Sequence, residues 1–143
     1  MTILESDHLR KLLFARPSYS ARENSDLFEA CYKLIEELLR SGITVALDAT
    51  NLEEHHRERV YHVVDQTGAG LVILRIEAPA EVVYERLQGR GRAADPEDRS
   101  EADSTVYDRM KPTADRIRRN HLVVDTSKDI TIALDKVARK IGP

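Results

Sequence analysis

Residues 43–51, ITVALDATN, give the clearest indication of the architecture. Residues 43–48 are short, rich in β-forming residues and apolar without alternation, which is typical of a strand covered on both faces. Asp48 ends this strand, and a carboxylate there is well placed to hold Mg²⁺ directly or through water. The alternative is that Asp48 and Thr50 only cap the following loop.

Three other segments have strand character, and helical patterns separate all four. The predicted strands are 2–5, 43–48, 71–77 and 121–125. The predicted helices are 8–13, Ser20 to Gly42, Asn51 to Gly68, Pro79 to about Gln88, Ser100 to an interruption at Pro112, and 130–141. Strands that alternate with helices predict right-handed crossovers and a parallel sheet. We therefore expect a three-layer α/β fold, one domain over 1–143, with about four strands in the order listed and helices on both faces.

Composition describes an ordinary soluble globular protein. The chain has 143 residues, 41% hydrophobic and 33% charged, with a net charge of −3. This charge gives no general attraction to nucleic acid or to an anionic membrane. Cys31 is the single cysteine, which excludes a disulfide framework and a thiolate metal site. No apolar run approaches the ~20 residues that span a bilayer, so we expect a cytoplasmic protein without a membrane partner.

Three aspartates lie at predicted strand ends. Asp7, Asp48 and Asp125 each follow an apolar strand, and parallel strands bring their carboxyl ends to one edge of the sheet. Asp7 with Arg10, one helical turn later, is a sensible pair for holding and activating a hydroxyl group. The alternative is that Asp7 caps its helix and Arg10 makes a surface ion pair worth under ~1 kcal/mol. For Asp125 a plain strand-to-helix turn is favoured.

The segment 89–100, GRGRAADPEDRS, is predicted to be a mobile loop. Arg86 lies at the end of the preceding helix, and Arg90 and Arg92 lie at the start of the loop. Guanidinium groups on a closing loop commonly neutralise a phosphoryl group during transfer. The alternative is a solvated charged loop, because its own acidic residues neutralise much of the positive charge. The adjacent His55 and His56 are expected to face different ways on a helix and to form no zinc pair.

Several motifs together resemble the small P-loop kinases. The motifs are Ser6-Asp7-x-x-Arg10, Arg16-Pro17-Ser18-Tyr19-Ser20, Gly42-x-x-Val45-x-x-Asp48-Ala49-Thr50-Asn51, Arg57, Ala78-Pro79 with the three arginines, Ser100 with Val106-Tyr107, and Val124-Asp125-Thr126-Ser127. More narrowly, they are similar to predicted ATP-dependent kinases grouped with polynucleotide 5′-kinases, chloramphenicol phosphotransferases and zeta-toxin-like enzymes. The resemblance covers nearly the whole chain.

The resemblance implies a role for each matching residue. Asp7 would be the general base on the acceptor hydroxyl, and Asp48 would serve the Mg²⁺ region. The acceptor side would be formed by Arg10, Thr50, Asn51 and Arg57. Arg86 and Arg90 would contact the nucleotide from a lid, in which Arg90 and Arg92 would also act in catalysis. ATP and Mg²⁺ would be the cofactors. The acceptor stays open among nucleic-acid ends, nucleosides, sugars, antibiotics and tRNA-linked groups.

The sequence departs from this family at one decisive point. These kinases begin with a strand and a G-x-x-x-x-G-K-[S/T] loop that holds the nucleotide phosphates, and this sequence contains no such motif. In the family the missing strand lies between those matching 43–48 and 71–77. Either these two strands pair directly, or a second copy or another chain fills the position. The chain as given is expected to be an incompetent kinase; a non-catalytic binding module and a split enzyme remain alternatives.

Overall fold

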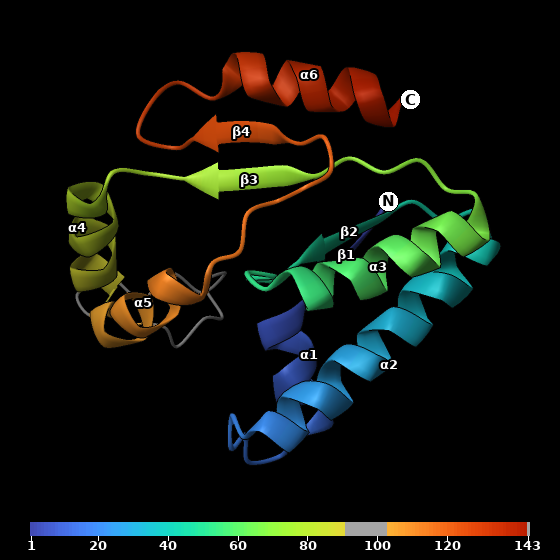
Figure 1. Cartoon of the computed structure of the whole chain (residues 1–143), viewed down its shortest axis with the longest axis horizontal. Coiled ribbons are helices and arrows are strands. Elements are labelled where there is room, and N and C mark those ends of the chain that lie inside the picture. Colours follow the sequence, from blue (N-terminus) through green and yellow to red (C-terminus); the bar gives the residue numbers. More distant parts are fainter. Residues whose placement is uncertain (91–102, 143) are drawn as a thin grey trace. The chain divides into compact units, whose positions relative to one another are not determined.

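The computed structural model describes residues 1–90 and 103–142, which divide into two compact units, 1–69 and 70–143 (Figure 1). The first unit contains β1 (Thr2–Glu5), α1 (Ser6–Leu13), α2 (Ala21–Arg40), β2 (Val45–Asp48) and α3 (Glu54–Thr67). The second contains β3 (Leu74–Glu77), α4 (Ala80–Arg90), α5 (Ser104–Met110), the 3-10 helix η1 (Lys111–Thr113), β4 (Leu122–Asp125) and α6 (Thr131–Ile141). Each unit is described by itself.

The sheet of the first unit is a parallel pair. Strand β1 pairs with β2 from Thr2 opposite Val45 to Glu5 opposite Asp48. The first strand has the predicted bounds, whereas β2 begins two residues later than expected. The reason lies in the end of α2, where the Ile43 amide donates to the Leu38 carbonyl over 2.9 Å and Gly42 has a φ of +74°. The Ile43 amide therefore belongs to the hydrogen bonds that end α2, and β2 begins only at Val45.

The helix starts differ from the predictions in two places. Helix α1 begins at Ser6 rather than at residue 8, so Asp7 lies in its first turn and does not belong to a turn before it. Asn51 does not cap α3, because the helix begins at Glu54 with Glu53 as N-cap and Asn51 has a φ of +41°. The predicted cap of α2 is confirmed, since the Ser20 hydroxyl accepts from an amide of that helix.

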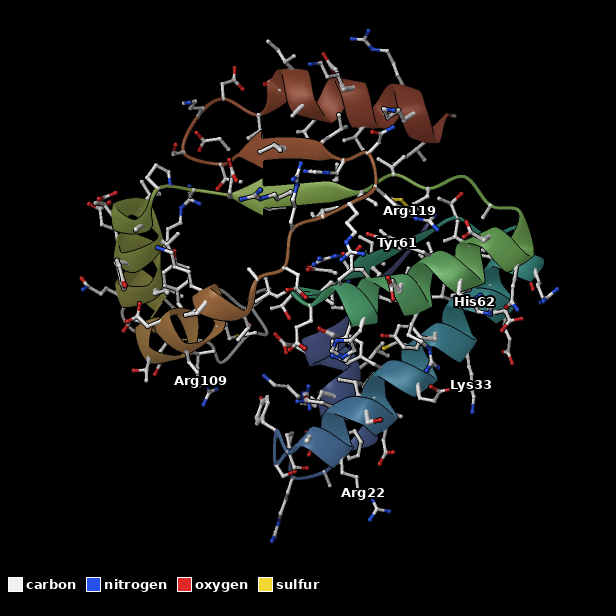
Figure 2. All side chains as sticks on the ribbon, in the orientation of Figure 1. Arg22, Lys33, Tyr61, His62, Arg109 and Arg119 are labelled. Carbon is white, nitrogen blue, oxygen red and sulfur yellow. The ribbon has the colours of Figure 1, made fainter. Side chains whose placement is uncertain are left out.

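The core of the first unit lies between its strand pair and its helices. One cluster of buried residues there consists of Leu4 from β1, Tyr32 and Ile35 from α2, and Val63 from α3. Figure 2 labels two adjacent residues of α3, Tyr61 and His62. Tyr61 is buried, whereas His62 is exposed. Apolar residues at helical spacing thus turn one face of α2 and one face of α3 towards β1 and β2.

The second unit contains the other parallel pair, with Leu74 opposite Leu122 and Glu77 opposite Asp125. Asp103 caps α5 by accepting from the Val106 amide over 2.9 Å. The predicted interruption at Pro112 is confirmed, because α5 gives way there to the 3-10 helix η1. The proposed start signal at Ser100 and the segment 91–100 of the predicted loop lie outside the described residues.

Burial in the second unit differs from the sequence-based expectation. All four residues of β3 are exposed in this unit, and the strand begins at Leu74 rather than at residue 71 as predicted. Ile76 on β3 is 60% exposed and Ile132 on α6 is 69% exposed.

The α/β fold class with parallel strands is confirmed. In the described residues β1 pairs with β2 and β3 pairs with β4, so these two neighbour relations of the predicted order are confirmed. A pairing of 43–48 with 71–77 would join the two units and stays a prediction. The one-domain organisation stays a prediction. In residues 1–90 and 103–142 no helix is both long enough and apolar enough to cross a membrane.

Candidate functional site

The carboxyl edge of the first unit brings the predicted aspartates to the same side. Because Glu5 is opposite Asp48 in parallel register, β1 and β2 end level with each other at about one strand spacing, ~4.8 Å. Asp7 follows two residues after Glu5 in the first turn of α1 and is partly exposed. Asp48 is exposed at the last position of β2. Two carboxylates therefore belong to one solvent-accessible edge.

Arg10 is buried and does not form the surface ion pair considered from sequence. It is 6% exposed, and its Nη1 donates to Glu23 Oε1 over 2.5 Å. Its Nη2 donates to Asn24 Oδ1 over 2.7 Å, and its guanidinium lies 4.7 Å from the centre of the Tyr19 ring. Its Nε is buried and has no hydrogen-bond partner among the described residues. In this conformation Arg10 ties α1 to the start of α2.

Glu23 gathers hydrogen bonds from the segment that precedes α2. Its carboxylate accepts from the Ser18 amide over 2.5 Å, from the Ser18 hydroxyl over 2.8 Å and from the Tyr19 amide over 3.2 Å. These donors, the Ser18 amide first, together with Arg10 lower the pKa of Glu23 from 4.5 to about 2 despite its burial. The ionised carboxylate is therefore a structural element of the folded first unit.

This lowered pKa predicts an acid-dependent loss of stability. A carboxyl group whose folded-state pKa is depressed contributes stability that is complete above its unfolded pKa and is lost as the pH falls through the folded pKa. We expect the wild-type advantage over Glu23→Gln in free energy of unfolding to shrink between about pH 4.5 and pH 2. Urea denaturation at stepped pH measures it. Glu36→Gln, at an exposed ion pair, is the control and should show no comparable change; a pH-independent Glu23→Gln difference would contradict the prediction.

Arg57 fixes the loop that follows β2. It is 6% exposed, and its Nη1 donates to the Asn51 carbonyl over 2.7 Å and to the Leu52 carbonyl over 2.6 Å. Its Nε and Nη2 lie 2.8 and 2.6 Å from Glu54 Oε2. A single guanidinium thus bridges the loop and the first turn of α3. The resemblance assigns Arg57 to the acceptor side, but here its guanidinium group contacts the backbone of the loop after β2.

The loop held by Arg57 carries the two other predicted acceptor residues. Thr50 is exposed. Asn51 adopts the left-handed conformation that asparagine tolerates better than most residues. Its Oδ1 is buried and has no hydrogen-bond partner among the described residues. A buried acceptor without a donor is costly, so this atom is a candidate partner for a ligand N–H or O–H group.

The three predicted lid arginines belong to the second unit. Arg86 on α4 donates from Nη1 to Thr126 Oγ1 and from Nη2 to the Thr126 carbonyl, each over 2.7 Å. Arg90 is the last residue of α4, and its side chain is not described. Arg92 lies outside the described residues. Arg86 therefore ties α4 to the end of β4 in this conformation.

Asp125 organises the turn after β4. Its carboxylate accepts from the Ser127 amide over 3.0 Å and from the Ser127 hydroxyl over 2.6 Å, and Lys128 lies 3.1 Å away. These donors, the Ser127 hydroxyl first, lower the pKa of Asp125 to about 2. The geometry matches the strand-to-helix turn favoured for DTS on sequence grounds.

A cluster that sequence reasoning missed lies at the start of α3. Glu53, His55 and His56 place one carboxylate oxygen and two imidazole nitrogens within 4.8 Å of one another. The two rings have centroids 4.0 Å apart, so the expectation that they face different ways is wrong. Adjacent residues diverge by about 100° around a helix, but the side-chain torsions bring these rings back together. The spacing Glu-x-His-His at a helix start was the available signal.

A cavity in the second unit lies at the opposite end of the strand pair from Asp125. Its volume is about 470 Å³, and its lining residues are Leu71, Ile73, Arg118, Arg119 and Asn120. These residues precede β3 and β4 in the chain, so the cavity is at the amino edge of this strand pair. In open parallel sheets ligands bind at the opposite, carboxyl edge. We therefore do not include it in the candidate site.

Comparison with known proteins gives a family and a fold. Residues 1–117 match the model of a family described as AAA domain. A structure from Chloroflexus aurantiacus assigned as a kinase has a TM-score of 0.73 and 16% identity, and covers 99% of this chain and 85% of that chain. The APS kinase of Mycobacterium tuberculosis in complex with AMPPNP and APS has a TM-score of 0.68 and 17% identity, and covers 98% and 79%. An unliganded sugar kinase from Janibacter sp. has a TM-score of 0.66 and 9% identity, covering 99% and 79%. No curated protein matches the chain.

Proposed function

Because the chain belongs to the AAA-domain family with a P-loop kinase-like fold, we propose that it carries the acceptor side of a phosphotransferase. The reaction would be phosphoryl transfer to the hydroxyl group of a small-molecule acceptor. The observation that carries this proposal is the register of β1 and β2, which end level at one edge with Asp7 and Asp48 beside it. In open α/β sheets that edge is where ligands bind.

Asp7 is the proposed general base. A hydroxyl group becomes a competent nucleophile when a carboxylate within hydrogen-bond reach accepts its proton during transfer. Asp7 is partly exposed in the first turn of α1 and can be approached from solvent. Thr50 and the Asn51 Oδ1 are the proposed polar partners of the acceptor, with Arg57 holding their loop in place. Arg10 is the proposed positioning residue that anchors α1.

Mg²⁺ fits the donor set near Asp48. The Asp48 carboxylate and the Thr50 hydroxyl are exposed oxygen donors on one connection. Mg²⁺ prefers oxygen ligands and retains several waters, so one carboxylate and a hydroxyl are a sufficient protein contribution. When bound, the ion would neutralise phosphate charge; Asp48 is the residue proposed to hold it.

The described residues do not fit the phosphates of ATP. The sequence contains no G-x-x-x-x-G-K-[S/T] loop, and both terminal nitrogens of Arg86 donate to Thr126. The phosphates of a nucleotide need a group of amides or cations directed at them. We therefore propose no step through the nucleotide for the chain as given. The lid role proposed for Arg86, Arg90 and Arg92 applies only when a separate segment supplies the phosphate-binding loop.

This proposal predicts weak nucleotide binding. Calorimetric titration of ATP with Mg²⁺ into the chain should give a dissociation constant no tighter than ~1 mM, equivalent to about −4 kcal/mol. The matched control is Arg86→Met, which should leave the weak binding unchanged, because Arg86 is bound to Thr126. Micromolar Mg²⁺-dependent binding that is lost in Arg86→Met would contradict the prediction and assign a phosphate site to the second unit.

A non-catalytic binding module is the second candidate. The observation that favours it is that Arg10 and Arg57 both use their guanidinium groups for internal contacts. A module of this kind would bind the acceptor without transferring phosphate, even after a phosphate-binding strand and helix are supplied. Phosphotransfer by such a chimera is therefore the measurement that separates the two candidates.

A further inference from the structure

The start of α3 brings together three side chains that commonly bind metal ions. Glu53 is the N-cap of α3, and His55 and His56 are in its first turn. Their ligand atoms lie within 4.8 Å of one another, and His55 Nδ1 is 3.3 Å from Glu53 Oε2. Two ligand atoms on one tetrahedral zinc ion are about 3.3 Å apart, because each lies about 2.0–2.1 Å from the metal. Small rotations of exposed side chains would close the remaining difference.

The surrounding structure holds one of the three ligands in place. The His56 ring stacks on Phe28 with centroids 5.4 Å apart, and the His56 carbonyl accepts from the Tyr32 hydroxyl over 3.4 Å. The backbone before Glu53 is held by the contacts of Arg57 with two loop carbonyls. His55 and Glu53 have side chains 65% and 47% exposed, so they can adjust around an incoming ion. One anchored ligand with two adjustable ones is a workable arrangement for a surface metal site.

The donor set selects a class of metal. Imidazole nitrogens favour zinc, copper, nickel and iron, whereas Mg²⁺ and Ca²⁺ favour oxygen ligands. Two histidines with one carboxylate leave at least one coordination position open to water.

We propose that Glu53, His55 and His56 form a binding site for a divalent transition metal ion, zinc foremost. The site is distinct from the proposed Mg²⁺ position at Asp48 in donor chemistry, and it does not depend on the proposed phosphotransferase function. A bound ion would link Glu53, the N-cap of α3, to the two histidines of the first turn. The ion would lie next to the loop whose carbonyls accept from Arg57.

The test is a zinc titration of the full chain in competition with a chromophoric chelator, repeated with Co²⁺ to record ligand-field absorption. We expect one ion per chain. His55→Ala and Glu53→Gln change exposed side chains, and His56→Phe keeps a ring against Phe28 while it removes both nitrogens. Each should weaken zinc binding by at least about tenfold, since losing even an outer partner of a metal ligand costs a site 10–100-fold.

His62→Ala is the matched control, because His62 is an exposed histidine on the same helix outside the cluster (Figure 2). It should bind zinc like the wild type, with the same Co²⁺ spectrum. Zinc binding that is equal in the wild type and all three cluster variants would overturn the proposal, as would the absence of binding at 100 µM free zinc, roughly a −5.5 kcal/mol threshold. Competition by millimolar Mg²⁺ would also overturn it, since oxygen-preferring ions should not occupy this donor set.

Discussion

Replacement of Asp7 by asparagine is expected to remove phosphotransfer from a chimera that carries the P-loop strand and helix of a related kinase before this chain. The change keeps the size of the side chain and removes its ability to accept a proton. Loss of a general base costs about 10²–10⁴-fold in rate. Turnover of ATP with a panel of small hydroxyl acceptors, measured beside ATP affinity, should show kcat reduced by this factor and ATP binding retained.

Asp26→Asn is the control for this experiment. Asp26 is an exposed aspartate on α2, 4.0 Å from Arg22, and belongs to none of the proposed sites. The chimera with Asp26→Asn should have the activity of its parent. Equal activity in the parent and in Asp7→Asn would remove Asp7 from the mechanism. A parent chimera that binds ATP but transfers no phosphate to any acceptor would favour the non-catalytic module.

Replacement of Arg57 by methionine is expected to destabilise the chain strongly. It would leave two loop carbonyls without their donor and the Glu54 carboxylate, 14% exposed, without this partner. Removing one partner of a buried ion pair costs about 3–5 kcal/mol. Guanidinium denaturation followed by far-ultraviolet circular dichroism should record a loss of about 3 kcal/mol in the free energy of unfolding.

Arg59→Met on the same helix is the comparison. Arg59 pairs with Glu29 over 2.6 Å, but its side chain is 57% exposed. Exposed pairs contribute under about 1 kcal/mol, so this variant should differ little from the wild type. If the two methionine variants lose equal stability, the loop contacts of Arg57 do not carry the energy assigned to them here.

The parts of the fold that were predictable from sequence depend on local signals. The four strand positions follow from short apolar runs, and the helix boundaries at Ser20, Gly68 and Pro112 follow from caps and breakers. These signals act within a few residues, so a single sequence contains them. The pairing of strands depends on contacts between distant segments. The pairings of β1 with β2 and of β3 with β4 are confirmed, whereas direct pairing of 43–48 with 71–77, or the insertion of another chain between them, rests on family order alone and stays a prediction.

The candidate site was less predictable because a residue type does not fix what its side chain contacts. Arg10 and Arg57 suit phosphate or acceptor binding by chemistry, yet their donors meet Glu23 and the loop carbonyls. Glu23 follows the helix start at Ser20 by three residues, and its carboxylate accepts from the Ser18 and Tyr19 amides before that helix. Which of several nearby partners a long polar side chain selects is decided by tertiary packing.

The division of the chain at Ala69 has a consequence for its synthesis. Strand β1 pairs with β2 inside the first unit, so this strand pair can form before residues 70–143 have left the ribosome. Translation of that second segment takes roughly 4–15 s at about 5–20 residues per second, which is long compared with the folding of a small domain. Strand β3, whose four residues are exposed, is then made when β1 and β2 have already paired. Sequential emergence would thus let the first strand pair form before the strands of the second unit can compete for either partner.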